Sequence, residues 1–493
     1  MLNRIKSFKM SNSDQITLSK SLLPVITLIF LLTFSGFYSY FYESSFLGEF
    51  TFHIILLFCA ILASVIGKTI GISFKIIIKA IINNIKNIGL AIAILILVGA
   101  LSGTWKISGI IPAMVYYGAD IPTNIFLPLT LIITALVSLT AGSSYITSAT
   151  IGIALVAIGS AFNINPGITA GAVISGAYFG DKMSPLSDTT NLASAISGTN
   201  LYTHIKYMMF TTFPTFILTF IIFSIIGLGI ESNVEVSEII QKEFIRGKLS
   251  EDFYLSPVLF IVPFSILVLA VLKVKPIITL FFGVLLACVF AYLFQGAQII
   301  DIIKSIIYGP LLNVEFNEQY DKIESLNELK KGFKQLYDEG GIISMNWVIS
   351  LTISAMIFGG SMDAIGALKC LTNYLLKKAK SIFGLFSSTL ISCMGVNISA
   401  SDQYLSIILP GKMFKNAYKK KGLSAENLSR TLEDSGTVTS PLIPWNSCGA
   451  YHSGVLGVPT AEYMLYSLFN LISPLMTLLF AYFKIKLKRI SKS

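Results

Sequence analysis

The sequence predicts an all-α polytopic membrane protein with about 10–12 transmembrane helices, and its composition and apolar runs carry this prediction. Hydrophobic residues make up 54% of the 493 residues, and charged residues make up only 13%. Soluble proteins carry roughly twice that charged fraction. Mean hydropathy is +0.75, and many apolar runs reach the roughly 20 residues that cross a bilayer. The composition excludes a soluble enzyme, a disordered chain and a disulfide scaffold.

Eight apolar segments are uninterrupted enough to be spans. In chain order they cover residues 22–42, 50–67, 88–112, 207–230, 255–272, 276–295, 342–362 and 464–483. Two further regions, 125–200 and 382–450, are apolar but broken by Gly, Pro, Ser and Asn. Interrupted helices or re-entrant segments are expected there, because irregular backbone at membrane depth must be buried in protein or line a cavity.

The loop charges predict an orientation. Basic residues cluster in the segments 67–89, 367–381, 412–434 and 484–493. The positive-inside rule places these segments, and with them both termini, in the cytoplasm. The loops 231–253 and 313–340 carry acidic excesses and are expected outside. The net charge of +10 therefore indicates topology, and we expect a lipid bilayer as partner and no nucleic acid.

The sequence also matches itself at a nearly constant offset. Gly103 and Gly109 fall on Gly360 and Gly366 at 257 residues, Tyr145 and Gly152 on Tyr404 and Gly411 at 259, and Gly180, Ser184 and Pro185 on Gly436, Ser440 and Pro441 at 256. The flanking charges of 88–112 and 342–362 are reversed, which predicts two inverted-topology repeats. Such repeats typify secondary transporters, whose substrate site lies near the midplane between the halves.

This repeat divides the chain into five regions. They are a two-helix region at 1–87, repeat 1 at 88–230, a linker with two spans and an acidic outer loop at 231–341, repeat 2 at 342–483 and a basic cytoplasmic tail at 484–493.

The first polar motif is G-D-K-M-S-P-L-S-D-T-T-N, Gly180 to Asn191. Pro185 disfavours helix at the residue before it, so the helix should end there and free backbone carbonyls. Oxygen ligands and carboxylates at membrane depth suit a hard monovalent cation. The candidate binding residues are Asp181, Ser184, Ser187, Asp188, Thr189 and Asn191. The alternative is a cytoplasmic loop in which Asp188 caps a helix. Lys182 is expected to pair with Asp181 or Asp188.

The second motif, L-E-D-S-G-T-V-T-S-P-L-I-P-W-N at Leu432 to Asn446, is the repeat mate of the first, and two prolines break it. Its candidates are Asp434, Thr437, Ser440 and Asn446. Thr437 stands where the first motif has Asp181, so the halves are not chemically equal. Glu433 borders the basic loop and is expected to be solvated.

The third motif is N-I-S-A-S-D-Q-Y, Asn397 to Tyr404, inside an apolar stretch from Ile382 to Pro410. Cytoplasmic charge flanks both ends of that stretch, so we expect it to enter the membrane and return. Asn397, Ser399 and Asp402 would then lie near the turn at membrane depth. The alternative for Asp402 is an interfacial charge.

With these motifs the sequence resembles the NhaC-type Na⁺/H⁺ antiporter family, within the ion transporter superfamily. The residues responsible are G-D-K-M-S-P-L-S-D-T-T-N-L-A at Gly180 to Ala193, D-Q-Y-L-S-I-I-L-P-G at Asp402 to Gly411, L-E-D-S-G-T-V-T-S-P-L-I-P-W-N-S-C-G-A at Leu432 to Ala450, and G-T-W-K-I-S-G-I-I-P at Gly103 to Pro112. The resemblance covers roughly residues 90–480. It implies sodium–proton exchange across a bacterial cell membrane. The family also includes malate/lactate exchangers, and Tyr145 stands where it has Trp, which leaves the substrate open.

The predicted mechanism is competition. A carboxylate in a partly desolvated site holds a proton or Na⁺ near neutral pH, but not both. Asp188 is the first choice for this carboxylate, with Asp181 and Asp402 next; the Na⁺ ligands are expected to be Asp188 and Asp402. No cofactor is expected beyond the transported Na⁺ and H⁺. The expected assembly is a homodimer in the bacterial inner membrane.

Two other functions compete with cation–proton exchange. Half-helix N-termini at the breaks could attract a carboxylate, so a Na⁺-coupled organic-acid or amino-acid transporter is the main alternative. An intramembrane aspartyl protease is disfavoured because the segment Ala177-Tyr178-Phe179-Gly180-Asp181 lacks the first glycine of a G-x-G-D motif. We therefore expect a transporter and not an enzyme.

Overall fold

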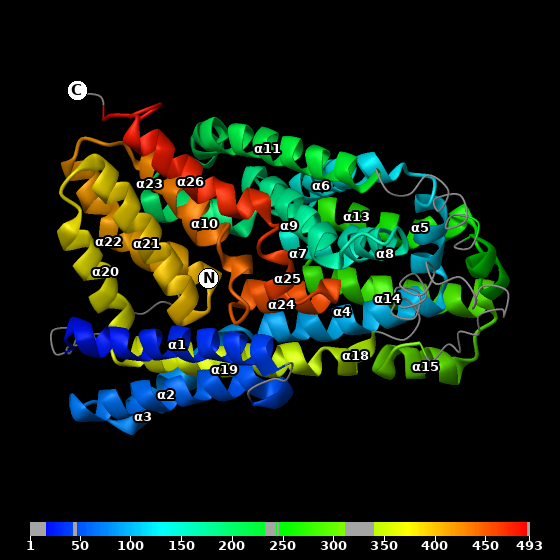
Figure 1. Ribbon diagram of the computed structural model, residues 1–493, viewed down its shortest axis with the longest axis horizontal. Coiled ribbons are helices and arrows are strands. Elements are labelled where there is room, and N and C mark those ends of the chain that lie inside the picture. Colours follow the sequence, from blue (N-terminus) through cyan, green and yellow to red (C-terminus); the bar gives the residue numbers. More distant parts are fainter. Residues whose placement is uncertain (1–15, 43–46, 232–242, 244–245, 311–339, 491–493) are drawn as a thin grey trace.

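The computed structural model describes residues 16–42, 47–231, 243, 246–310 and 340–490 (Figure 1). Within these ranges the regular structure is helical, and the single β-bridge joins Leu423 to Arg489. Nine of the described helical segments are long and apolar enough to cross a membrane, or ten if the bent pair Arg246–Asp252 and Pro257–Val271 forms one span. The predicted all-α polytopic class is confirmed.

The nine segments follow the order of the predicted spans and broken regions. They lie in α1 (Leu18–Tyr42), α2 (Thr51–Thr69), α4 (Gly89–Ile107), α6 (Thr123–Ala141), α7 to α8 (Ser144–Ala161), α11 (Leu201–Glu231), α14 (Pro276–Gln295), α18 to α19 (Gly341–Ala364) and α21 (Ile382–Ala400).

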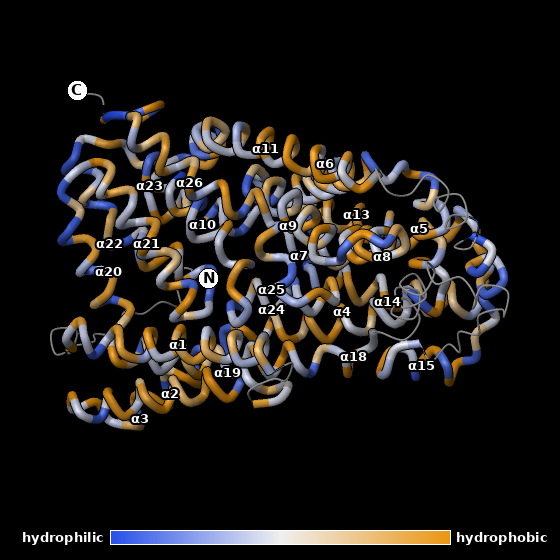
Figure 2. Tube along the Cα trace, viewed as in Figure 1, coloured by the Kyte–Doolittle hydropathy of each residue, from blue (hydrophilic) through white to orange (hydrophobic). Residues whose placement is uncertain are grey.

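The surface is apolar around the middle and polar at the ends. In Figure 2 hydrophilic residues gather at the two ends of the long axis, and hydrophobic residues cover the helices between them. Large apolar side chains on these helices are open to the surroundings; Phe30 is 65%, Leu228 62% and Leu293 64% exposed. Contiguous apolar surface of this kind marks a membrane-facing protein.

Three of the four basic segments meet at one end of the molecule. They adjoin α20 (Ala367–Lys378), α22 (Gln403–Lys420) and α23 (Ala425–Leu432), which lie together at the left of Figure 1. Lys421 Nζ donates to the carbonyl of Lys380 at 2.6 Å. Lys488 in the tail pairs with Glu426 at 2.7 Å. This clustering agrees with the predicted orientation, which stays a prediction. The predicted acidic loops lie largely outside the described residues.

Some boundaries differ from the sequence prediction. The expected span 88–112 ends at Ile107, and a new helix, α5 (Ile110–Gly118), follows. The basic segment 67–89 contains a helix, α3 (Phe74–Asn87), that packs on α19, with Asn84 donating to the carbonyl of Met356 at 3.4 Å. The expected span 464–483 appears as the short helix α26 (Leu468–Tyr482).

Helix lengths and turns recur at the repeat offset. The matching pairs are α4 and α19 with 19 residues each, α6 and α21 with 19 each, and α10 (Asp188–Ser197) and α24 (Ser447–Leu456) with 10 each. Each helix is followed within two residues by a left-handed residue: Gly109 and Gly366, Gly142 and Ser401, and Gly198 and Gly457. A duplicated unit would give this pattern. The duplication and its inversion remain predictions.

A glycine stripe lets α9 (Pro166–Met183) lie directly on α6. A Cβ at Gly176 would stand 2.1 Å from Thr134 Oγ1, and one at Gly180 would stand 2.3 Å from the carbonyl oxygen of Ala135. Small residues at i and i+4 permit such close contact between membrane helices. The stripe fixes the end of α9 and therefore the position of the polar residues that follow it.

Candidate functional site

Two interrupted helices meet near the centre of the fold. In the first half, α9 ends at Met183, and α10 begins at Asp188 after the break that contains Pro185. In the second half, α23 runs into the π-helical turn η6 (Glu433–Thr437) and the 3₁₀ turn η7 (Ser440–Leu442), and α24 begins at Ser447. The breaks lie where the prolines predicted them. π-Helical turns are rare and frequent at functional sites.

Two helix hairpins bring their turns to these breaks. The first joins α6 to α7 (Ser144–Thr147) through Gly142 and Ser143, and the second joins α21 to α22 through Ser401 and Asp402. The chain therefore reverses within the third motif, as expected. Whether the hairpin is re-entrant in the bilayer remains a prediction.

Asp181 lies in the interior and is held by the turn of the first hairpin. Its side chain is only 7% exposed. Its Oδ2 accepts from the backbone N–H of Ser144 at 3.1 Å and from the Ser144 hydroxyl at 2.8 Å. Among the described residues no Lys, Arg or His forms an ion pair with it. It is thus a buried carboxylate that is hydrogen-bonded but has no protein cation.

Asp188 and Asp402 are more accessible than Asp181. Asp188 is exposed, in the first turn of α10, and Ser187 caps that helix by accepting from the N–H of Thr190 at 3.5 Å. Asp402 is half-buried and caps α22, accepting from the N–H of Leu405 at 2.7 Å.

The three carboxylates lie in the same part of the molecule as Tyr404. Tyr404, which is 46% exposed, lies within electrostatic range of Asp188, Asp402 and Asp181. The two acidic residues of the first break and the acidic residue of the second hairpin turn therefore lie in one part of the fold. Asp181 is the buried member of this set, and Asp188 is the exposed one.

Neutral oxygens of the first motif shape its break. Ser184 is buried and accepts from the N–H of Leu186 at 3.2 Å. The hydroxyls of Thr189 and Ser187 are 3.1 Å apart. Asn191 donates to the carbonyl of Ser187 at 2.7 Å. These hydrogen bonds hold the backbone of the break in its non-helical conformation, and none of them involves Asp181 or Asp188.

Two asparagines fasten the second hairpin to the second break. Asn397 Nδ2 donates to the carbonyl of Gly436 at 2.8 Å and to Thr439 Oγ1 at 3.1 Å. Asn446 Nδ2 donates to Asn397 Oδ1 at 3.2 Å, and its own Oδ1 caps α24 through the N–H of Cys448 at 3.0 Å. Both side chains use their hydrogen-bonding groups on the protein, so they act here as supports of the site.

Of the remaining candidates in this half, Ser399 and Ser440 donate to nearby backbone carbonyls and Thr437 does not. Ser399 donates to the carbonyl of Gly395 at 2.5 Å, and Ser440 to that of Thr437 at 2.6 Å. The hydroxyl of Thr437 is fully buried and has no hydrogen-bond partner among the described residues.

Asp434 is paired inside the protein. It is fully buried and forms an ion pair with Lys182, which is also fully buried. Asp434 further accepts from Thr211 at 2.9 Å, from Ser473 at 3.1 Å and from Thr477. The expectation that Lys182 pairs with Asp181 or Asp188 is wrong, because packing across the two halves brings Asp434 to it instead.

Glu433 is also buried, with 0% of its surface exposed. The expectation that it is solvated is wrong. It follows the basic loop in sequence, but α23 carries it inward before the π-helical turn begins.

The structure connects Tyr145 to Cys448 and Gln403, two residues that the sequence did not mark as binding candidates. Tyr145 donates to Cys448 Sγ at 3.2 Å, and Cys448 donates to Gln403 Oε1 at 3.0 Å. Gln403 in turn donates to the carbonyl of Thr437 at 3.5 Å. The repeat offset of 259 maps Ser144 onto Gln403. That offset could have drawn attention to both hairpin contacts.

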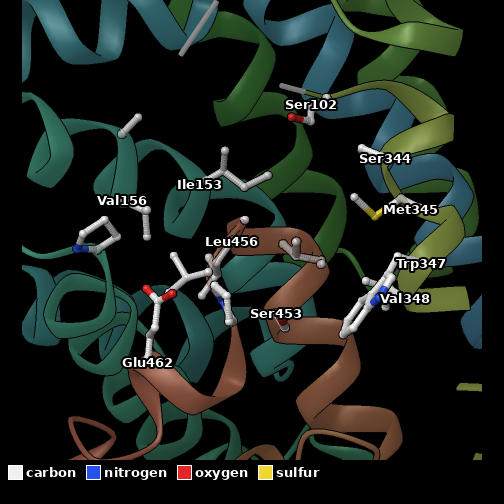
Figure 3. A pocket seen from close by; sticks show the side chains of 18 of the residues that line it. Ser102, Ile153, Val156, Ser344, Met345, Trp347, Val348, Ser453, Leu456 and Glu462 are labelled. Carbon is white, nitrogen blue, oxygen red and sulfur yellow. The ribbon is translucent and has the colours of Figure 1, made fainter. Parts of the chain in front are cut away.

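A separate cavity of about 1010 Å³ adjoins this centre. Figure 3 shows Ser453 and Leu456 on its α24 side, Trp347 and Val348 on its α19 side, and Glu462 pointing into it. The predicted binding residues do not line it. Because α24 begins at the polar centre and ends at the cavity, one short helix separates them.

Among the described residues, no group of three or more His, Cys, Asp and Glu side chains is placed to hold a metal ion. The Na⁺ ligands predicted at Asp188 and Asp402 remain predictions.

Residues 176–485, which contain both interrupted motifs and the second hairpin, match the Na⁺/H⁺ antiporter family. The chain belongs to that family. An "Na(+)/H(+) antiporter NhaC" of Alkalihalophilus pseudofirmus is 39% identical over 392 residues, 79% of this chain and 81% of the relative. The resemblance to NhaC-type proteins is thereby confirmed.

Antiporters with other named substrates are also similar to this family member. The "Malate-2H(+)/Na(+)-lactate antiporter" of Bacillus subtilis is 34% identical over 80% of this chain and 81% of its own length. The "Arginine/ornithine antiporter ArcD" of Halobacterium salinarum is 33% identical over 80% of this chain and 78% of its own. The relatives are transporters of small solutes.

Proposed function

We propose that this chain exchanges Na⁺ for H⁺ by alternating access, with both ions competing for intramembrane carboxylates. The observation that carries the proposal is Asp181, a buried carboxylate at the end of α9 that accepts two hydrogen bonds from Ser144 in the first hairpin turn and has no ion-pair partner among the described residues. A buried site that is lined by oxygen atoms and has no Lys, Arg or His as ion-pair partner suits a monovalent cation or a proton. No resident cofactor is needed for this exchange, and no bond of a substrate is broken, so we propose a transporter and not an enzyme.

Asp181 is the exchanging carboxylate in this proposal. Competition requires a site in which an ionised carboxylate without a counter-ion is costly. Asp181 meets that condition because it is buried, whereas Asp188 is exposed and serves to attract the cation. The two bonds from Ser144 hold the carboxylate in place while a proton or Na⁺ occupies its remaining lone pairs.

The cavity provides the path to the second side of the membrane. It is lined by Tyr308 and Gly340, which flank the loop that the charge pattern places outside. The exposed residue Asp188 belongs to the path from the other side. A tilt of α24 against α4 and α19 would close one path and open the other, as in repeat-based transporters.

The test is transport by the purified protein in liposomes with an internal pH dye. Addition of external Na⁺ should make the lumen alkaline, since protons leave as Na⁺ enters. Asp181→Asn should abolish this signal, and Asp188→Asn should raise the Na⁺ concentration needed for half-maximal rate. Silence of the intact protein with Na⁺ alone would contradict the proposal.

Competition between H⁺ and Na⁺ for one carboxylate predicts a second result in the same liposomes. Lowering the pH should raise the apparent KM for Na⁺, because protons occupy the shared carboxylate, while the maximal rate at saturating Na⁺ changes less. A pH effect on the maximal rate alone would contradict shared occupancy.

The size of the cavity favours one alternative, Na⁺-coupled exchange of an organic acid or amino acid. Its volume is in the range of small-molecule pockets, up to about 1000 Å³, and far exceeds what a bare cation needs. Lys106 and Glu462, one of each charge, are among its lining residues. The two functions can be separated by adding malate, lactate, arginine or ornithine to the same liposomes. Proton movement that occurs only when one of these solutes is present would favour the alternative.

The setting of the protein follows from the same proposal. We propose a multi-pass protein of the bacterial inner membrane with both termini in the cytoplasm, working as a homodimer. The basic cluster formed by the ends of α20 and α22 and by the tail supports this orientation.

A further inference from the structure

Glu433 is a buried carboxylate that the proposed exchange does not use. It is fully buried at the start of η6, and neither Oε1 nor Oε2 has a hydrogen-bond partner among the described residues. A carboxylate in a low-dielectric interior normally takes several hydrogen bonds or an opposite charge. Its surroundings must therefore supply something that the protein's own donors do not.

Thr437 faces the same space. It lies four residues later on the π-helical turn, and its hydroxyl is the side-chain group that interacts with the Glu433 carboxylate. The two groups do not meet hydrogen-bond geometry, and both keep all their side-chain oxygens unpartnered within the described structure. A carboxylate and a hydroxyl that face one another in the interior offer the oxygen ligands that a hard cation takes.

Neither nearby cation forms an ion pair with Glu433, although Arg430 is fully buried and its guanidinium has no hydrogen-bond partner among the described residues. Lys182 exerts the strongest positive influence on Glu433, but it is bound in the ion pair with Asp434. Arg430, one turn earlier, faces two aromatic rings instead: its guanidinium lies 4.6 Å from the ring centroid of Tyr207 and 5.8 Å from that of Phe480.

The interior carboxylates differ in whether a protein cation pairs with them. Asp434 has its own lysine, whereas Asp181 and Glu433 each lack an ion-pair partner in the described structure. The two lie within electrostatic range of one another. Each of these two carboxylates, when ionised, carries a negative charge that no ion pair in the described structure compensates.

We infer that Glu433 and Thr437 form a second Na⁺ position, next to the one at Asp181. Glu433 supplies two carboxylate oxygens, and Thr437 supplies its hydroxyl oxygen. The inference rests on the proposed function and deepens it, because it makes the protein bind two Na⁺ per chain. The two positions are on opposite halves of the repeat, since Thr437 stands where the first half has Asp181.

The test is equilibrium binding of radioactive ²²Na⁺ to the full-length purified protein at alkaline pH. The intact protein should bind about two Na⁺ per chain at saturation. Glu433→Gln should remove one of the two. Glu426→Gln is the matched control, because Glu426 lies on α23 but pairs with Lys488 at the surface, and it should leave both.

Thr437 provides a test that does not remove a charge. Thr437→Val keeps the shape and deletes the oxygen, so one binding step should weaken by about tenfold. Thr437→Ser keeps the oxygen and should bind as the intact protein does. This pair of variants remains informative if Glu433→Gln fails to fold. Elution of each variant as a single symmetric peak in size-exclusion chromatography would show that it is folded.

The outcomes separate this inference from the proposed function. One Na⁺ bound per intact chain, or two bound by Glu433→Gln, would overturn the second position. If Asp181→Asn loses Na⁺ while Glu433→Gln keeps the full number, exchange at Asp181 stands and the second position falls. If the intact chain binds no Na⁺, both fall.

Discussion

The ion pair between Lys182 and Asp434 should be the interaction whose disruption costs most. It joins α9 of the first half to η6 of the second, across 252 residues of sequence. Both side chains have 0% exposure. Asp434→Asn would remove the negative charge and leave the lysine ammonium buried without a counter-ion.

The expected cost follows from burial. Breaking one side of a buried ion pair costs about 3–5 kcal/mol, because the remaining charge loses its compensation. That range corresponds to a shift in the unfolding equilibrium of about two to three and a half powers of ten. Adding Lys182→Met to Asp434→Asn removes both charges and leaves no buried charge without a counter-ion, while the amide oxygen can still accept from Thr211 and Ser473. The double variant should therefore be more stable than Asp434→Asn by about 2 kcal/mol or more.

The assay is unfolding in mixed micelles by titration with SDS, followed by intrinsic fluorescence for the intact protein, both single variants and the double variant. A coupling energy from the full cycle measures the pair itself. Additive losses in the double variant, or a loss below about 1 kcal/mol in Asp434→Asn, would refute the reasoning that the pair is dry and mutually compensating.

Three further variants test the supports of the site. Gly180→Ala would put a Cβ 2.3 Å from the carbonyl oxygen of Ala135, so α9 and α6 must separate and the midpoint of SDS unfolding should fall; an unchanged midpoint would show that the glycine contact is not tight. Ser144→Ala removes the shorter hydrogen bond to Asp181, so the KM for Na⁺ in the liposome assay should rise severalfold while the protein stays folded. Ser144→Thr keeps the hydroxyl donor and should raise the KM less. Asn446→Ala removes the cap of α24 and should cost about 1 kcal/mol of stability in the same SDS titration.

Much of the fold could be predicted because its causes are local. Hydropathy over about 20 residues predicts a span wherever it lies in the chain. Pro185 and Pro441 stop helices through their own missing N–H groups, and both breaks appear where they were expected. Boundaries set by contact with another helix were less predictable: α3 packs along α19, although its lysines suggested a loop.

The candidate site divides in the same way. The sequence by itself determined which segments carry oxygen-rich breaks and acidic residues, since composition and proline position are properties of short stretches. Only the tertiary structure decided what each acid does. It paired Asp434 with Lys182, placed Glu433 in the interior, left Asp188 exposed and brought Ser144 to Asp181. The partner and burial of a charge depend on packing between residues far apart in sequence, and only packing sets the cost of that charge.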